Sequence, residues 1–585
     1  MQGRGKPQFT ADWTPLPLIP CPFSVYPASP CRYTSQGALK CRIDRPVSTR
    51  TPRPPAFALP SGNLPHMTPS AAPHYDYDVD LMIVGGGING VGIARDAAGR
   101  GLKVLLCEKS DLASATSSNS SKLIHGGLRY LENYEFRLVR EALSERDVLL
   151  SNAPHIVHPL RFVLPHNRHL RPAWMIRIGM FLYDNLARRS ARLPGSRRLA
   201  LRSAAQGVPL KSDITTGFEY SDARVDDSRL VVLNAMDARQ RGATILTRTT
   251  CVGLEKQDGH WLVRLLAEDG ATLTARARVL VNAAGPWVEA LQRLAAPAEG
   301  GKTASKLRLV KGSHFTVPRM YEGDWAYILQ NPDGRIVFVI PYQERYSLVG
   351  TTDVIFTGDP ATVKISEEEI AYLCETVNGY FKTAISGADI TWSYSGVRPL
   401  YDDQAGNASE VTRDYVFDVN TGEPGDPVLL SIFGGKITTY RRLAEHALEK
   451  LAPHTRKPTA WTARAVLPGG DMPQADPQAY ERTFSARFPW LAPAIAHRYI
   501  YTYGTLAERI LGGATSVSDL GQDFGAGLYE CEVRWLVEHE WARTADDILW
   551  RRTRLGLVAG PETTQRLTDW LGSHPAPGRE QAISI

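Results

Sequence analysis

Asp-Leu-Met-Ile-Val-Gly-Gly-Gly-Ile-Asn-Gly, residues 80–90, is a short apolar run that passes directly into a glycine-rich turn. Its glycines at 85, 87 and 90 have the spacing of a dinucleotide cradle. Gly85 permits the tight turn, Gly87 lets the backbone approach a pyrophosphate, and Gly90 lets the following helix pack against the strand. We expect a helix from Ile88 to about residue 98, with its positive N-terminus facing the phosphates.

A second apolar run extends this unit. Residues 103–107 predict the next strand, and Glu108 follows it, 23 positions after Gly85. In dinucleotide-binding units an acidic residue about 20 positions on binds a ribose hydroxyl. The order of strand, turn, helix, strand and acid is far more specific than a glycine pattern alone.

The stretch that follows indicates which dinucleotide is bound. Residues 115–130, Ala-Thr-Ser-Ser-Asn-Ser-Ser-Lys-Leu-Ile-His-Gly-Gly-Leu-Arg-Tyr, hold six hydroxyl-bearing side chains, a lysine and a histidine. A buried pyrophosphate and isoalloxazine ring need many hydrogen-bond partners, because every polar group removed from water must be satisfied. An NAD enzyme does not need such a loop, so the pattern favours FAD.

Further motifs are long enough to be specific. They are residues 125–131, 170–177, 282–287, 311–314, 350–353, 395–400, 412–415, 433–440 and 547–556. Through them the chain, from about Tyr77 to Leu571, resembles the FAD-dependent glycerol-3-phosphate dehydrogenases of respiratory chains, and no motif position departs from the family pattern.

The resemblance implies an α/β fold. It would comprise a Rossmann-like FAD-binding domain of the D-amino-acid-oxidase/glutathione-reductase-2 type, an interleaved antiparallel-sheet substrate domain and a helical C-terminal domain. We expect a Pro/Arg-rich N-terminal extension over 1–75 and a discontinuous FAD-binding domain over 76–452, with substrate-domain insertions at about 150–220 and 300–395. A linker over 453–472 and the helical domain over 473–575 would complete the chain.

Local patterns agree with this organisation. Alternating apolar residues predict strands at 243–251, 261–267 and 277–281 and an antiparallel sheet over 306–353. Ser366 and Glu369 predict a capping box at a helix start. Apolar residues at helical spacing predict helices at 529–545 and 545–557, and we expect Trp535, Trp541 and Trp550 there to be core residues.

The motifs and the resemblance together give a set of predicted contacts to non-covalently bound FAD. These residues are Gly85, Gly87, Ile88, Asn89, Gly90, Glu108, Thr116, Ser117, Ser120, Ser121, Lys122, Leu123, His125, Gly126, Val252, Ala284, Gly285, Trp287, Asp353, Arg398, Gly435, Lys436, Ile437 and Thr438.

Four cations lie in loop-like motifs flanked by glycine, proline or turns, where site residues are common. Arginine matches phosphate oxygens with a planar fork, and lysine adds a point charge. Singly, each would be expected to be a surface cation paired with an acid. By resemblance, Arg129 with Tyr130, Arg413 and Lys436 would bind the substrate phosphate, and Arg398 would lie near the substrate hydroxyl and the flavin.

His314 is the predicted proton acceptor. A histidine titrates near neutral pH and can accept the hydroxyl proton as hydride leaves. The alternative is a histidine packed under a sheet with no catalytic role. His125 is the competing base, although its neighbours Gly126 and Gly127 favour a place against the cofactor.

Charge and cysteine usage bound the remaining possibilities. The net charge of +6 arises entirely from residues 1–66, which hold eight Lys or Arg against two Asp, so a basic nucleic-acid-binding body is not supported. That proline-rich stretch predicts disorder, and Met67 is a plausible start. Cys21, Cys31 and Cys41 lie in it. Cys107, Cys251, Cys374 and Cys531 are scattered without metal spacing and fit reduced positions in a cytosolic compartment.

The sequence contains no run of about 18 apolar residues, so we expect no membrane-spanning helix, but one segment could lie on a membrane surface. Residues 168–202 contain nine arginines and a single acid, Asp184, around the apolar stretch 174–183. Such a segment suits an interface with anionic lipid, and a solvated core helix is the equal alternative. The resemblance favours membrane contact, with Trp174, Ile176, Met180 and Phe181 buried in the lipid.

The function implied is oxidation of sn-glycerol 3-phosphate to dihydroxyacetone phosphate, with electrons passed to membrane quinone. Alternatives are an oxygen-reducing glycerol-phosphate oxidase, an amine or amino-acid oxidase of the sarcosine-oxidase kind, and a flavin-holding scaffold or RNA-modification partner. The cation count opposes the amine oxidase. Expected partners are glycerol 3-phosphate, quinone and an anionic membrane surface on the inner face of the cytoplasmic membrane, without nucleic acid. A homodimer and the electron acceptor stay open.

Overall fold

The computed structural model describes residues 75–167, 170–187, 192–296, 306–402, 414–455 and 459–575. Most of the predicted N-terminal extension, with its three cysteines and Met67, lies outside these residues, as do Arg188, Arg189 and Arg413.

The first sheet contains the predicted dinucleotide unit. Strand β1 (Tyr77–Val84) lies between two parallel partners, β2 (Val104–Cys107) and β10 (Thr272–Asn282). The strand order is β17-β18-β10-β1-β2-β7, and an antiparallel pair, β8 and β9, extends it from β10. The other bounds are β7 (Thr244–Leu246), β8 (Thr249–Gln257), β9 (His260–Ala267), β17 (Val416–Asn420) and β18 (Val428–Phe433). The strands predicted from 243 to 281 are confirmed, with a break between β7 and β8.

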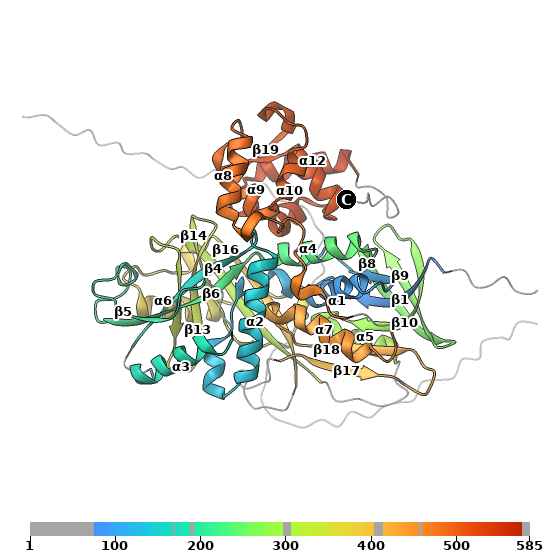
Figure 1. Ribbon diagram of the computed structural model, residues 1–585, viewed down its shortest axis with the longest axis horizontal. Coiled ribbons are helices and arrows are strands. Elements are labelled where there is room, and N and C mark those ends of the chain that lie inside the picture. The colour runs from blue at the N-terminus through green and yellow to red at the C-terminus, as the bar shows by residue number, and fades with distance from the viewer. Residues whose placement is uncertain are drawn as a thin grey trace, which may run out of the picture. The chain divides into compact units, whose positions relative to one another are not determined.

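Both faces of this sheet are covered (Figure 1). Leu81 and Ile83 of β1 share one apolar cluster with helices α1 (Ile88–Gly99), α4 (Asp227–Gln240) and α7 (Tyr440–Leu451). Met82 points to the opposite face, where Trp261 of β9 and Leu291 of α5 (Val288–Ala295) lie. Burial on both faces explains the continuous apolar run in β1. In an α/β sheet, ligands bind in the crevice at the carboxyl ends of the parallel strands.

The second sheet is mainly antiparallel, as the alternation over 306–353 predicts. Its order is β15-β11-β14-β13-β12-β4-β6-β3, with β16 beside β11 and β5 beside β6. Helix α6 (Glu367–Tyr380) packs on it and begins at the predicted capping box of Ser366 and Glu369. The strands are β3 (Leu123–Ile124), β4 (Val157–Pro165), β5 (Arg197–Ala200), β6 (Thr216–Val225), β11 (Leu307–Pro318), β12 (Trp325–Gln330), β13 (Ile336–Tyr342), β14 (Tyr346–Gly350), β15 (Val354–Ile355) and β16 (Trp392–Tyr401).

The C-terminal part is helical and gathers above the sheets in Figure 1, coloured orange to red. Trp535 is a core residue, whereas Trp541 and Trp550 are half-buried against the same core. Its helices are α8 (Pro477–Arg487), α9 (Pro493–Tyr503), α10 (Leu506–Leu511), α11 (Glu530–His539) and α12 (Pro561–Ser573), beside a small hairpin of β19 (Asp523–Gly525) and β20 (Leu528–Tyr529).

The predicted helix over 545–557 is wrong in form. The structure has a π-helical turn at Asp547–Arg552, and Arg554 has a left-handed φ of 60°. These departures turn the arginines of this segment toward buried carboxylates of the first sheet's domain, so long-range ion pairing outweighs the local helical pattern.

Helices α2 (Phe136–Asn152) and α3 (Ala173–Asn185) complete the fold. Met180 of α3 is fully buried and Ile176 packs inward, so their predicted exposure to lipid is wrong. Residues 176, 180 and 183 share one helix face, whereas Trp174 and Phe181 lie on the other, 63% and 65% exposed. Among the described residues no helix is long and apolar enough to cross a membrane.

Candidate active site

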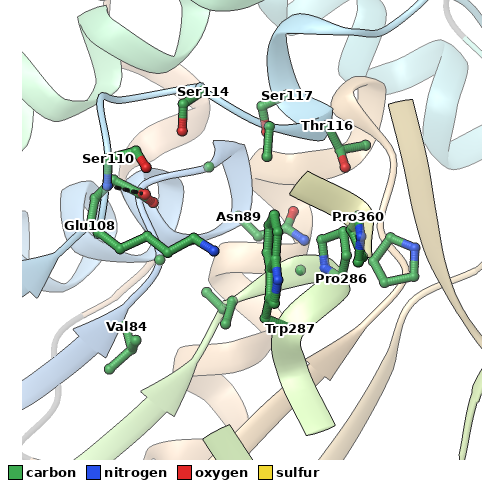
Figure 2. Close-up of a pocket in the computed structure, with 18 of the residues that line it drawn as sticks. Val84, Asn89, Glu108, Ser110, Ser114, Thr116, Ser117, Pro286, Trp287 and Pro360 are labelled. Atoms are coloured by element: carbon green, nitrogen blue, oxygen red, sulfur yellow. Dashed lines mark hydrogen bonds between the residues drawn. The ribbon is translucent and has the colours of Figure 1, made fainter. Parts of the chain in front are cut away.

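A cavity of about 590 Å³ opens at the carboxyl ends of β1, β2 and β10, beside the glycine turn (Figure 2). Its volume is that of a site for a large organic ligand. Of the predicted cofactor residues, eleven line it: Gly85, Gly87, Ile88, Asn89, Glu108, Thr116, Ser117, Ala284, Gly285, Trp287 and Gly435.

The glycine positions leave no room for side chains. Gly85 has a φ of +117°, and a Cβ there would lie 2.4 Å from the carbonyl oxygen of Ala283. A Cβ on Gly90 would lie 1.9 Å from the carbonyl oxygen of Gly85, so Gly90 sets the close packing of α1 on β1. Gly87 faces the cavity, where its nearest neighbour would be the Ser117 hydroxyl at 3.0 Å. These are the three roles expected of the fingerprint glycines.

Glu108 is held in the cavity wall by two backbone donors. The N–H of Gly86 donates to its Oε2 at 2.7 Å, and the N–H of Ser110 donates to its Oε1 at 2.9 Å. Burial raises the pKa of this carboxyl, and the backbone donors oppose that rise. Each carboxylate oxygen keeps a second lone pair for a ligand hydroxyl.

The cavity lining fits FAD. The side-chain oxygen of Asn89 is buried and has no hydrogen-bond partner among the described residues, so it can accept a bond from a ligand. The first N–H groups of α1 face the glycine turn without an acidic residue in the first helical turn. A pyrophosphate there would meet the positive end of the helix.

Several lining residues were not predicted. Lys109 lies with its Nζ 3.5 Å from the Trp287 ring, and its position directly after Glu108 could have identified it. The 360–363 segment carries no sequence signal for this role. Other lining residues outside the predicted set include Ser110, Ser114, Asn119, Thr250, Cys251 and Ser395 to Val397.

The remaining predicted cofactor residues lie outside the lining set, and their contacts to FAD stay predictions. Gly126 contributes to the packing near the site, because its N–H donates to the Tyr183 hydroxyl at 2.9 Å. Val252 is exposed on β8. They are Gly90, Ser120, Ser121, Lys122, Leu123, His125, Gly126, Val252, Asp353, Arg398, Lys436, Ile437 and Thr438.

His314 lies on β11, 2% exposed, beside the hydroxyl-rich loop. Its Nε2 is 2.8 Å from the Ser121 hydroxyl, and its ring stacks on Tyr394 with centroids 4.9 Å apart. Its Nδ1 is buried without a hydrogen-bond partner among the described residues. Burial, then the charges of Arg398 and Lys122, hold the pKa of His314 well below its ordinary value. The ring is therefore neutral near pH 7 and keeps one unprotonated nitrogen, and the same burial and charges oppose its protonation.

Arg398 lies on β16, next to β11, and is partly exposed. Its guanidinium pairs with Asp353 and donates to the Thr351 hydroxyl at 3.3 Å. The structure thus brings together the two predicted catalytic residues, His314 and Arg398, on adjacent strands.

A second group of predicted residues meets where the 125–130 and 436–438 segments lie side by side. Lys436 Nζ lies 4.0 Å from the centre of the Tyr130 ring. The backbone N–H of His125 donates to the Thr438 hydroxyl at 3.3 Å. Arg129 is half-buried on the same segment as Tyr130. Arg413, the fourth predicted cation, lies outside the described residues.

The described residues contain no cluster of ligands for a metal ion, and their four cysteines are unpaired. Burial raises the pKa of Cys251, in the cavity wall, to about 12, which makes it an unreactive thiol.

Comparisons with known proteins cover nearly all of this structure. The FAD dependent oxidoreductase family matches residues 80–441, and the C-terminal domain of alpha-glycerophosphate oxidase matches residues 460–574. A glycerol-3-phosphate dehydrogenase of Pseudomonas aeruginosa is 55% identical over 88% of this chain and 99% of its own length. A D-erythritol 1-phosphate dehydrogenase of Brucella abortus is 51% identical over 81% and 94%.

The fold comparison agrees. The crystal structure of a glycerol-3-phosphate dehydrogenase from Bacillus halodurans, complexed with FAD, superposes with a TM-score of 0.64 at 25% identity, covering 87% of this chain and 97% of that one.

Proposed function

The chain belongs to the family of FAD-dependent glycerol-3-phosphate dehydrogenases, and from this we propose that it oxidises the C2 hydroxyl of sn-glycerol 3-phosphate to the ketone of dihydroxyacetone phosphate. The observation that carries the proposal is the buried His314, whose Nε2 lies 2.8 Å from the Ser121 hydroxyl of the hydroxyl-rich loop and whose pKa is lowered by the charge of Arg398 on the neighbouring strand. FAD, when bound, supplies the acceptor for the hydride from C2.

His314 accepts the hydroxyl proton in this proposal. A neutral imidazole can take the proton as the hydride leaves, and Ser121, bonded to Nε2, fixes the ring's orientation. Arg398 lies beside the reacting hydroxyl, where its positive charge stabilises developing negative charge on the oxygen.

The phosphate is assigned to Arg129, Tyr130 and Lys436, together with Arg413 as the resemblance implies. Support comes from the Lys436–Tyr130 contact and from Arg129, which makes no ion pair within the described part of the chain. A phosphate there would gain charge-assisted hydrogen bonds.

D-Erythritol 1-phosphate is the second candidate substrate, because the Brucella relative is nearly as similar as the glycerol-3-phosphate dehydrogenases. It also carries a terminal phosphate, so the same cations would bind it. Purified holoenzyme should be assayed with both substrates, and with a quinone analogue and oxygen supplied separately. A higher kcat/KM for glycerol 3-phosphate with the quinone analogue supports the proposal; preference for the four-carbon substrate, or for oxygen, overturns that part of it.

We also propose that α3 attaches the enzyme peripherally to the inner face of the cytoplasmic membrane, where it would pass electrons to quinone. Trp174, Ile178, Phe181 and Leu182 form an exposed apolar face on this helix, and Arg177 lies among them. Aromatic and aliphatic groups next to arginine suit an anionic lipid surface.

Vesicle binding tests this attachment. Phe181→Glu should weaken binding to anionic vesicles, because it replaces an apolar side chain of the interface with a negative charge that the anionic lipid repels. Val208→Glu, at a site 69% exposed on another surface, is the matched control and should bind as the unmodified protein does. Equal binding by both variants overturns the assignment of α3.

A further inference from the structure

The 547–556 motif has no part in the site described above, although it is one of the longest motifs in the chain. Three of its arginines, Arg551, Arg552 and Arg554, leave the C-terminal domain and reach buried aspartates of the FAD-binding domain. We call residues 551–554 the arginine segment and residues 109–122 the cofactor loop. Members of the loop, including Ser114, Thr116 and Ser117, line the FAD cavity.

The first end of the cofactor loop is held through Asp111, which is 2% exposed. Arg551 Nε lies 2.6 Å from its Oδ2 and Arg552 Nη2 lies 2.7 Å from its Oδ1. Arg552 also donates to the carbonyl oxygen of Glu540, within the C-terminal domain. Ser110 and Ser114, on either side of Asp111, line the cavity.

The second end is held through Asp227, which is fully buried. Arg554 Nη2 lies 2.5 Å from its Oδ1. The same carboxylate accepts bonds from the Ser120 hydroxyl at 2.7 Å and from Lys122 Nζ at 2.9 Å. Ser121, between these two residues, makes the bond to Nε2 of His314.

The charges explain why these contacts matter. Lys122, with φ of 57°, is a buried cation whose charge is neutralised by Asp227. The charge of Asp227 is in turn neutralised by both Lys122 and Arg554. Removing one partner from a buried ion pair leaves an uncompensated charge, which is strongly destabilising. The loop would then rearrange so that water can reach the uncompensated charge.

We propose that the C-terminal domain clamps both ends of the cofactor loop through the arginine segment, and that Arg554 is a positioning residue for His314. The part about His314 rests on the proposed function; the part about the loop does not. Since the aspartates of both ends are buried in one seam with the arginines, docking of the C-terminal domain completes the FAD site.

The test compares Arg554→Met with Arg498→Met in the full-length holoenzyme. Arg498 is the matched control: its buried partner Glu532 lies within the C-terminal domain, and in the described part of the chain Arg498 bonds only to Glu532 and to the carbonyl oxygen of Gly527, away from the cofactor loop. Both variants should lower Tm. Only Arg554→Met should lower kcat, by about 100-fold, because small misplacements of a catalytic group have effects of this size. Its KM should change less than about threefold.

Arg554→Lys should restore part of kcat, since a single cation can still meet Asp227. If both Met variants lower kcat equally below their melting temperatures, the arginine segment is an ordinary domain seam and Arg554 has no positioning role. An unchanged kcat in Arg554→Met overturns the role as well.

Arg551→Gln gives a measurement independent of the substrate, and it also serves if Arg554→Met fails to fold. It leaves Arg552 on Asp111, so the domains stay docked. Its FAD dissociation constant, measured by flavin fluorescence, should rise about tenfold, as expected for loss of its one charge-assisted contact with the loop; its pairs with Asp546 and Asp547 lie within the C-terminal domain. An unchanged FAD affinity contradicts the clamp on the loop, whichever substrate the enzyme oxidises.

Discussion

Two groups of cations in this chain use the same charge in opposite ways. In the arginine segment, Arg552 and Arg554 are buried and meet two or more carboxylate or carbonyl oxygens each. At the proposed substrate site, Arg398 is about a third exposed and meets one carboxylate, and Arg129 makes no ion pair within the described residues, although its charge helps to lower the pKa of Asp333. A cation saturated by carboxylates holds domains together, whereas one that is poor in them keeps donors for an anionic ligand.

The largest expected effect concerns the buried side of this comparison. Arg552→Met removes two of the three bonds to Asp111 and both bonds to the Glu540 carbonyl oxygen, and leaves the buried Asp111 with Arg551 alone, so the free energy of unfolding should fall by about 3 kcal/mol, the lower end of the range for a broken buried pair. Thermal and denaturant unfolding measure it. Arg534→Met, which breaks an exposed pair with Glu530, should cost less than about 1 kcal/mol. Equal losses would remove the distinction between the two kinds of pair.

The next effect separates chemistry from binding. His314→Ala should lower kcat by about 10² or more, because it removes the proposed proton acceptor, with a smaller change in KM. His497→Ala, in the C-terminal domain, is the control and should leave kcat as it is. Steady-state kinetics with glycerol 3-phosphate decide this. A nearly normal rate in His314→Ala would pass the role of base to another residue, with His125 the first to examine.

Arg129→Ala tests the substrate side of the comparison. It should raise KM for glycerol 3-phosphate by about 10- to 150-fold, the value of one charge-assisted contact of roughly 1.5 to 3 kcal/mol, and leave Tm nearly unchanged. Arg335→Ala is matched to it, since that guanidinium is already paired with Asp333 at 2.7 Å. If Arg129→Ala lowers Tm and spares KM, Arg129 belongs with the structural cations.

The smallest expected effect is the loss of stability at acidic pH. His155 is fully buried and lies against Gly469 and Gly504 of the C-terminal part, and burial lowers its pKa to about 3. Its folded pKa is below its unfolded value, so its contribution to stability is complete above about pH 6.5 and is lost as pH falls toward 3.

At pH 5 the loss should be about 2 kcal/mol. His155→Leu should flatten this part of the stability profile, measured by denaturant unfolding at several pH values. An identical pH profile in the variant would show that other groups, among them His158, govern acid unfolding.

The cofactor half of the site could be predicted because its signals are local. The glycines at 85, 87 and 90 and the acid at 108 lie on one strand–turn–helix–strand unit, and their geometry follows from backbone sterics. The capping box at Ser366 is equally local and is confirmed.

Other features depend on partners far along the chain. Nothing near Asp111 indicates a pair with Arg552, and the arginine segment was expected to be helical until those pairs are considered. For α3 the sequence left a membrane-surface segment and a core helix as equal alternatives, and it did not indicate the inward face, because Met180 and Phe181 are equally apolar and only the neighbouring sheet decides which of them is buried.

One apolar core joins the helices on the first sheet with those of the C-terminal part, Val91 and Leu230 with Tyr499 and Leu536. This continuity constrains synthesis on the ribosome. Asp111 emerges 440 residues before Arg551, so the nascent FAD-binding domain must wait for nearly the whole chain before the charges at its cofactor loop are neutralised. During that interval it exposes both apolar surface and unpaired carboxylates, and we expect it to bind chaperones. By the clamp proposed above, premature termination within the last helices would disrupt the flavin site as well as remove the C-terminal domain.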